Sequence, residues 1–531
     1  MVDRQSRPGV TPRPWRTLPR PVLVAAPVGF VVVLATALVT ARAGVTQAVV
    51  LPNWWGDWPR RQPGRLVGWV TAGVVLLGVL CTLWTWLGLS LLRPVSADGM
   101  SASPDVERWA DRSRRWRVQV LAGLAAAWSL PLLVTGPMGS LDVQSYAAVG
   151  RLAARGLDPY HATPGWLTDG FGAAVDPRWR WTPTPYGPLQ VAILRGLALV
   201  AGREVGTAVL LIRAVAVLGL AVGVVLAIRA VPLVDRVPVL LITALNPVVL
   251  VHVVSGAHLD VLVGALAVLV VGLTRSGRPA TAMAFAVVAC EVKLPGAVLI
   301  AFVLLDVLRS AAAPDRLRSL VRVVGSGLGT LAAVLALCPD PFGWLGALNV
   351  PGLSHNGTAP STWISYLATA VMQPLVGHGP EPSFAVGRPV TAVIGAAVAC
   401  FLLWRATSGP RPAAFWGVGW ALMAVALTGP ALYPWYLTWG LFAVAVGSGL
   451  AGRVVVMGLS SAACLAAAMG SDTIVVVTWV VITLAILGFT GWVGRALLAD
   501  RSADQQQEDD HLADVPRSPA RATAPRPRPE G

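Results

Sequence analysis

The sequence is poor in charged residues, and this excludes most soluble classes of protein. Only 13% of its 531 residues are charged and 55% are hydrophobic, whereas soluble domains carry about 25% charged residues. The mean hydropathy is +0.67. Apolar runs long enough to cross a bilayer recur from Pro21 to Leu498. We expect an all-α polytopic membrane protein, a bundle of about 13 to 14 transmembrane helices.

Paired cysteines and lysine are also missing. The five cysteines lie in or beside apolar segments and form no C-x-x-C pair, which disfavours a disulfide framework or a structural zinc site. Lys293 is the only lysine, and the other 40 basic residues are arginine. Such a composition is typical of a GC-rich genome, for example that of an actinomycete.

The net charge of +15 does not indicate nucleic acid as a partner. The arginines lie mostly in short segments between apolar runs, as the positive-inside rule describes. Basic segments beside a membrane also contact anionic head groups. We therefore expect membrane lipids, and no nucleic acid, as partners.

The chain divides into four parts. Residues 1–20 and 500–531 are predicted to be disordered cytoplasmic tails. Residues 21–116 contain two apolar runs and a basic cytoplasmic loop, and residues 117–499 form the main membrane body with large polar loops at 136–204 and 339–385. The predicted spans are 21–41, 66–92, 117–135, 205–228, 237–255, 259–274, 279–291, 294–309, 320–338, 386–404, 413–429, 432–450, 454–470 and 474–495.

The orientation depends on the apolar segment 186–202, which either spans the membrane or lies along its surface. If it lies along the surface, the arginines of all later loops fall on the cytoplasmic side. This arrangement requires 279–309 to be two short segments broken at Glu291–Lys293. We prefer it, and it brings to the outer face all six tyrosines together with Asp142, His258, Asp260, Glu291, Lys293 and His355. One-sided polar chemistry indicates an active site that faces outward.

The first outer loop contains the first candidate for catalysis. Asp142 follows an apolar run and begins an amphipathic stretch that also contains Tyr146. A carboxylate in this position suits a general base. It equally suits a helix N-cap.

The same loop is rich in aromatic side chains and arginine. Tyr160 ends a D-P-Y motif, and Tyr186 lies in the run W-R-W-T-P-T-P-Y-G-P-L. Such rings can stack on sugars or anchor the loop at the head-group layer. The neighbouring Arg178 and Arg180 can bind a phosphate.

Later turns carry further polar candidates. His258 and Asp260 form an H-x-D motif that is either functional or a structural pair, and two ligands are too few for a metal. Lys293 suits a phosphate contact, with an ion pair to Glu291 as the alternative. His355, Tyr433 and Trp435 could line a sugar pocket or serve as loop and interface anchors.

The order of these motifs resembles a known family. D-x-x-x-Y, D-P-Y, P-Y-G-P-L, N-P…H-x-D, K-x-P and Y-P-W-Y follow one another over about 120–440. This order is similar to that of the actinobacterial polyprenol-phosphate-mannose-dependent α-(1→6)-mannosyltransferases, which belong to the GT-C membrane glycosyltransferases. The resemblance implies juxtamembrane helices in the first outer loop, and makes the spans before residue 117 an N-terminal addition.

The resemblance also implies a function. A polyprenyl-phosphate-mannose donor would give its mannose, with inversion, to a mannan or lipoglycan acceptor at the outer face of the plasma membrane. Asp142 would be the base, and Lys293 with Arg178 or Arg180 would bind the phosphate. No cofactor is expected, and the need for a divalent metal stays open. Two alternatives remain: a GT-C enzyme using arabinofuranose or glucose, and a transporter of lipid-linked sugars.

Overall fold

The computed structural model describes residues 20–42, 66–92, 104–140, 142–338, 340–348, 350, 357–376 and 384–469. Every regular element within these ranges is a helix, which confirms the all-α prediction. The C-terminal tail 500–531, the predicted span 474–495 and nearly all of 1–20 lie outside the described residues.

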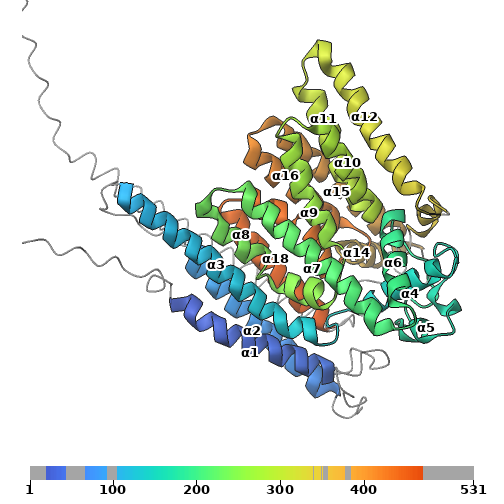
Figure 1. Cartoon of the computed structure of the whole chain (residues 1–531). Coiled ribbons are helices and arrows are strands. Elements are labelled where there is room, and N and C mark those ends of the chain that lie inside the picture. Colours follow the sequence, from blue (N-terminus) through green and yellow to red (C-terminus); the bar gives the residue numbers. More distant parts are fainter. Residues whose placement is uncertain are drawn as a thin grey trace, which may run out of the picture.

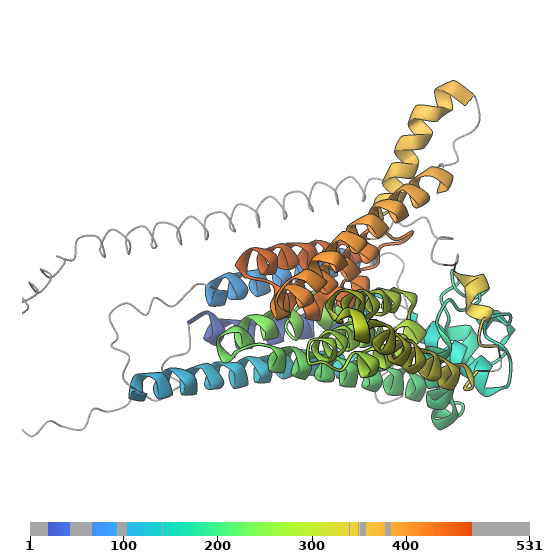
Figure 2. The ribbon, with the colours of Figure 1, turned by 90° about the horizontal axis from the view of Figure 1, so that it is seen from above.

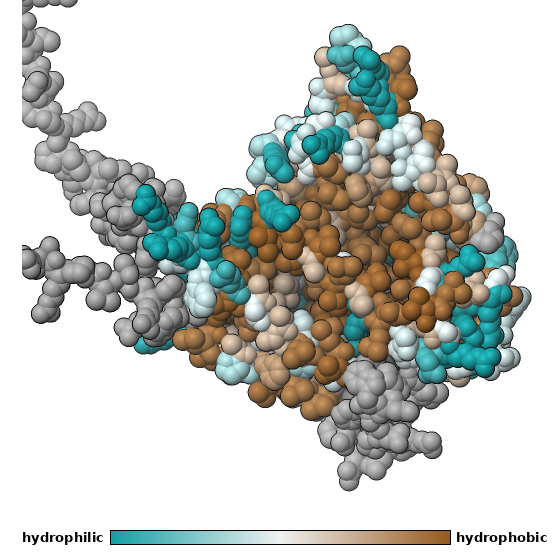
Figure 3. Space-filling model, in the orientation of Figure 1, coloured by the Kyte–Doolittle hydropathy of each residue, from teal (hydrophilic) through white to brown (hydrophobic). Residues whose placement is uncertain are grey.

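Six of the described helices are long and apolar enough to cross a membrane. Figure 3 shows an apolar band between hydrophilic ends, as a membrane-spanning bundle requires. The polytopic membrane class is thereby confirmed, because several helices must each bury an apolar length of about 30 Å. They are α1 (Arg20–Arg42), α2 (Leu66–Leu92), α3 (Pro104–Val134), α7 (Val205–Ala230), α12 (Ala313–Leu335) and α15 (Phe384–Ser408).

Shorter helices complete the bundle. α9 packs against α7, α10 and α17, and α16 packs against both α15 and α17 (Figure 1). The shorter helices are α8 (Arg236–Thr243), α9 (Val261–Thr274), α10 (Pro279–Val292), α11 (Ala297–Ser310), α14 (Pro360–Val376), α16 (Arg411–Thr428), α17 (Thr438–Gly447) and α18 (Leu450–Met469).

Several predicted boundaries were wrong. The span expected at 237–255 is two pieces, because α8 ends at Thr243 and a π-helix, η7 (Val249–Ser255), follows the Asn246–Pro247 step. The span expected at 432–450 starts as a 3-10 turn, η10 (Pro434–Leu437), so α17 begins only at Thr438. Proline lacks an N–H donor and favours such a break.

Two predicted loops contain helix. α3 begins at Pro104, so the arginines of the basic loop lie on a helical extension. The loop expected at 339–385 contains α14, which extends away from the other helices beside α15 (Figure 2).

The first polar loop folds into a cap at one end of the bundle. It contains α4 (Asp142–Ala154), η5 (Pro164–Trp166), α5 (Gly170–Ala174) and α6 (Pro188–Ala201) (Figure 1). α6 packs on α4 and has 14 residues, which rise about 21 Å, too little for a core of about 30 Å. α9 and α10 have the same length of 14 residues, so the placement of 186–202 along the membrane surface stays a prediction.

A buried arginine ties the cap to the bundle. Arg213 of α7 donates to the carbonyl oxygens of Leu133 and Thr135 at 3.0 Å each, and to that of Ser255 at 2.9 Å. These carbonyls belong to the end of α3 and the end of η7. Arg213 therefore holds the entry to α4 next to the turn that carries His258.

Candidate functional site

Asp142 is the first residue of α4, and its carboxyl group is partly buried. Burial raises its pKa from 3.8 to about 6, although the positive charges of Lys293 and Arg178 and the Ser140 hydroxyl oppose the rise. A carboxylate whose pKa lies near the working pH suits proton transfer. The chain reaches α4 through Gly139, whose φ of +77° favours glycine.

Lys293 occupies the predicted break between α10 and α11. α10 ends at Val292, and Lys293 has an extended backbone with φ −158° and ψ 136°. The P-Y-G-P motif packs against this break, because a Cβ on Gly187 would lie 2.1 Å from the carbonyl oxygen of Glu291. A glycine is therefore required at residue 187 for the start of α6 to approach the lysine.

The partner of Lys293 is Asp260 and not Glu291. Lys293 Nζ lies 2.7 Å from Asp260 Oδ1, which also accepts a hydrogen bond of 2.7 Å from Trp439 Nε1. Asp260 is 3% exposed. A buried carboxylate of this kind needs such donors to remain charged.

Aromatic rings surround the ammonium group. Lys293 Nζ lies 4.4 Å from the ring centre of Tyr436, 5.5 Å from that of Trp439 and 5.6 Å from that of Tyr186. Each distance is within the range of a cation–π contact. Four segments distant in sequence therefore meet at this lysine.

A stack of rings forms a second wall. His258 stacks on Trp435 with ring centres 3.8 Å apart, and Trp435 stacks on Tyr433 at 4.7 Å. Tyr146 of α4 forms a hydrogen bond of 3.0 Å with His258 Nδ1. Nε2 of this histidine is buried and has no partner among the described residues. His258 Nδ1 lies 4.0 Å from Asp260, so the two are neighbours without a direct hydrogen bond.

The two candidate arginines of the first loop, Arg178 and Arg180, have different partners. Arg178 forms two bonds with Asp176, Nε to Oδ1 at 3.1 Å and Nη2 to Oδ2 at 3.0 Å, and this pairing raises its pKa. Its charge also acts on Asp142, which places Arg178 at the rim of the cluster. Arg180 instead donates to the carbonyl of Ala173 at 3.3 Å, and no described contact brings it to Asp142.

The two remaining candidates are Tyr160 and His355. The Tyr160 hydroxyl donates a hydrogen bond of 3.1 Å to the carbonyl oxygen of Tyr186 and so helps to position that residue. His355 lies outside the described residues.

Sequence reasoning missed some members of the cluster. Trp439 donates to Asp260, the partner of Lys293, and His252 lies 5.3 Å from Trp435 between ring centres. His252 lies in the π-helix η7, an element frequent at functional sites. The H-x5-H spacing of His252 and His258 was the only local signal.

One group of described residues has metal-ligating side chains. Ligand atoms of Asp158, His161 and Asp340 lie within 4.8 Å of one another at the surface of the cap. The hydrogen bond of 2.7 Å to Asp158 raises the pKa of His161.

Comparison with known proteins identifies the family. Residues 24–309 match the family model described as alpha-(1→6)-mannopyranosyltransferase, N-terminal domain. The chain belongs to this family. Residues 361–497 match the model described as MptB C-terminal domain. The first match includes α1 and α2, and together the matches contain the whole cluster around Asp142 and Lys293.

Similar proteins come from actinobacteria. Alpha-(1→6)-mannopyranosyltransferase A of Mycobacterium tuberculosis is 30% identical over 413 residues, which are 73% of this chain and 75% of that protein. Alpha-(1→6)-mannopyranosyltransferase B of Corynebacterium glutamicum is 25% identical over 401 residues, 70% of this chain and 64% of that protein. No solved structure matches. The resemblance seen in the motifs is confirmed, and the chain is a mannosyltransferase.

Proposed function

We propose that this mannosyltransferase takes mannose from a polyprenyl-phosphate-mannose and forms an α-(1→6) linkage on a mannan or lipoglycan acceptor. The reaction inverts the anomeric centre and takes place at the outer face of the plasma membrane. The observation that carries the proposal is Asp142, a partly buried carboxylate with a pKa of about 6 beside Lys293 and an aromatic wall.

Asp142 acts as the general base. Its carboxylate accepts the proton of the acceptor 6-hydroxyl as that oxygen bonds to the anomeric carbon. The bond between this carbon and the donor phosphate breaks, and the polyprenyl phosphate leaves with both electrons. A phosphate leaves readily, so no strong general acid is needed at the opposite face of the sugar.

Lys293 and Arg178 stabilise the charge that grows on the phosphate. An ammonium group has three N–H donors, and Lys293 gives one of them to Asp260. Two donors remain for phosphate oxygens. The exposed guanidinium of Arg178 adds a second positive charge at the edge of the cluster around Lys293. Arg180 has a structural role in this scheme, since its described bond is to the loop backbone.

The aromatic wall binds the sugars. Tyr433 is the partly exposed ring of the stack and offers its face to a sugar, while the buried Trp435 and His258 support it. Tyr146 joins this wall to α4, the helix that carries the base.

The test compares Asp142→Asn with Glu204→Gln. Both changes remove one carboxylate from the same loop, but Glu204 is exposed at the start of α7 and makes no cap bond. Purified proteins receive radiolabelled polyprenyl-phosphate-mannose and a short α-mannoside. We expect Asp142→Asn to lose about 10²- to 10⁴-fold in rate and Glu204→Gln to keep the wild-type rate.

Other results would change the conclusion. Equal activity of Asp142→Asn and wild type would move the base elsewhere. Transfer from arabinofuranose or glucose donors in place of mannose would contradict the proposed donor. Absence of any transfer, with movement of the donor across vesicles, would favour a transporter. The buried Arg213 argues against a transporter, because backbone carbonyls already engage it.

A further inference from the structure

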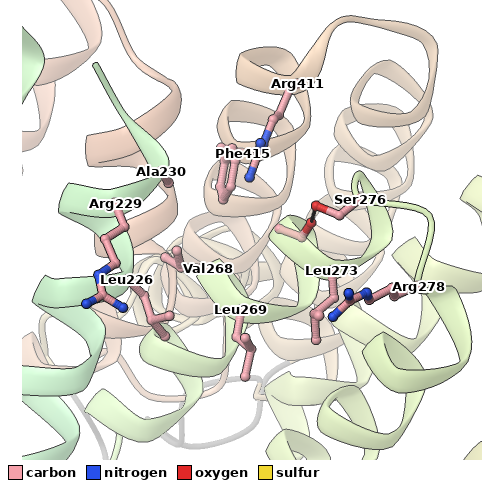
Figure 4. A pocket seen from close by; sticks show the side chains of 11 residues that line it. Leu226, Arg229, Ala230, Val268, Leu269, Leu273, Ser276, Arg278, Arg411 and Phe415 are labelled. Carbon is pink, nitrogen blue, oxygen red and sulfur yellow. Dashed lines mark hydrogen bonds between the residues drawn. The ribbon is translucent and has the colours of Figure 1, made fainter. Parts of the chain in front are cut away.

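A hollow lies at the end of the bundle opposite the cap. It has a volume of about 440 Å³ and lies between α7, α9, the start of α10 and the start of α16 (Figure 4). Its walls are largely apolar and include Leu226, Leu269, Leu273 and Phe415. α7 leads from the cap to this hollow, so the pocket is about one helix length from Asp142.

Three arginines surround the pocket. Arg229 lies in the last turn of α7, Arg278 precedes α10, and Arg411 begins α16 (Figure 4). All three are exposed, and no carboxylate belongs to the described lining. Three positive charges from separate segments therefore surround one apolar hollow.

Two other arginines at this end of the bundle form ion pairs with carboxylates. Arg275 lies 3.3 Å from Asp306, and Arg453 lies 2.9 Å from Asp235. For the three pocket arginines, the described part of the chain provides no side-chain hydrogen bond or ion pair. Unpaired guanidinium groups around a cavity favour an anion, and above all a phosphate, because their donors match its oxygens.

An apolar stripe leads from the pocket along α7. Leu218, Val222 and Val225 are 65%, 47% and 45% exposed. They precede Arg229 at intervals of three and four residues, so all four share one helix face. The pocket therefore presents charge at the level of a head group and apolar surface at the level of acyl chains.

We propose that this pocket binds an anionic phospholipid. Arg229, Arg278 and Arg411 attract the phosphate of the head group from different sides of the hollow, and an acyl chain lies along the stripe of α7. The apolar stripe favours a lipid over free phosphate. Since Asp142 lies at the other end of α7, this phosphate is distinct from the leaving group of the transfer reaction.

The test uses the delipidated full-length protein in neutral detergent. Dissociation constants are measured by native mass spectrometry for phosphatidylglycerol, phosphatidylcholine, undecaprenyl phosphate and inorganic phosphate. The variant is Arg229→Gln/Arg278→Gln/Arg411→Gln. Each arginine near an anionic lipid contributes about fivefold in affinity, so the triple variant is expected to bind phosphatidylglycerol about 100-fold more weakly.

A control variant removes the same charge elsewhere. Arg316, Arg318 and Arg322 are exposed on α12, near its start, at the same end of the bundle. Changing all three to Gln is expected to leave phosphatidylglycerol binding within about twofold of wild type, because they lie away from the pocket. If the pocket triple variant does not fold, the three single variants carry the test, each with a loss of about fivefold.

Several results would overturn the proposal. Equal binding of phosphatidylglycerol and phosphatidylcholine would show that the net charge of the head group does not determine binding. Equal losses in both triple variants would indicate general surface charge. Inorganic phosphate that competes as well as the lipid would assign a soluble anion, and undecaprenyl phosphate that displaces the phospholipid at lower concentration would assign an isoprenoid ligand.

Discussion

Replacing Asp142 by Asn tests two properties of this carboxylate. One is the cost of its burial in unfolding free energy, and the other is its role as the base in the transfer reaction. Burial raises the pKa of Asp142 from 3.8 to about 6, and a shift of this size corresponds to about 3 kcal/mol of stability at neutral pH. Below about pH 4 the group is protonated in the folded and unfolded chain, and it costs nothing. Between about pH 4 and 6 only the unfolded chain ionises, so stability falls as pH rises. Above about pH 6 the full cost is present.

Asparagine carries no charge and avoids this cost. Asp142→Asn is therefore expected to lose about 10²- to 10⁴-fold in rate, yet to be more stable than wild type at pH 7.5 by up to about 3 kcal/mol, and about equal to it at pH 4. Thermal unfolding in detergent at both pH values, beside Glu204→Gln, measures the difference. In wild type, kcat/KM is expected to fall about tenfold per pH unit below pH 6. An Asp142→Asn protein that is less stable at pH 7.5, or an acid limb near pH 4, would refute the reasoning.

Four further changes have defined outcomes. Tyr146→Phe removes the partner of His258 Nδ1 and is expected to cost about 1–3 kcal/mol in unfolding free energy; no loss would mean that water replaces the hydroxyl. Trp435→Leu removes the ring on which Tyr433 stacks and is expected to raise the acceptor KM more than it lowers kcat, as steady-state kinetics would measure. Gly187→Ala places a Cβ against the Glu291 carbonyl and is expected to destabilise by about 1–3 kcal/mol; an unchanged Tm would contradict this. Transfer is expected to persist in excess EDTA, and loss restored by one divalent cation would assign a metal to the reaction.

Local patterns were sufficient wherever one physical effect dominates. Apolar length predicted the spans, because a bilayer leaves few alternatives to a helix. The charges and proline of E-V-K-L-P predicted the break between α10 and α11, which the structure has at Lys293. The prediction was wrong at 237–255, where apolar residues continue through an Asn-Pro step and a π-helix without a change in hydropathy.

The sequence identified most residues of the candidate site, but it did not identify the side chains that they contact. Asp142, Tyr146, Tyr186, His258, Asp260, Lys293, Tyr433 and Trp435 were selected from the sequence, and described contacts or charge interactions link them. The sequence suggested Glu291 as the partner of Lys293, since it is two residues away. The actual partner is 33 residues away in the chain. Nothing local to Trp439 distinguished it from an interfacial anchor, and only its bond to Asp260 does so.

Composition and motif order by themselves determined the membrane class, the helical fold and the family of this protein, because each depends on residue types and their succession along the chain. Tertiary structure decided which charges are paired and which are free. Asp142 has a raised pKa only because the cap is folded over it, and Lys293 is oriented only because α9 and α17 bring Asp260 and Trp439 to it. The three pocket arginines likewise come together only because the end of α7 and the starts of α10 and α16 meet. Burial and pairing depend on distances between segments that are far apart in sequence, so the chain alone does not reveal them.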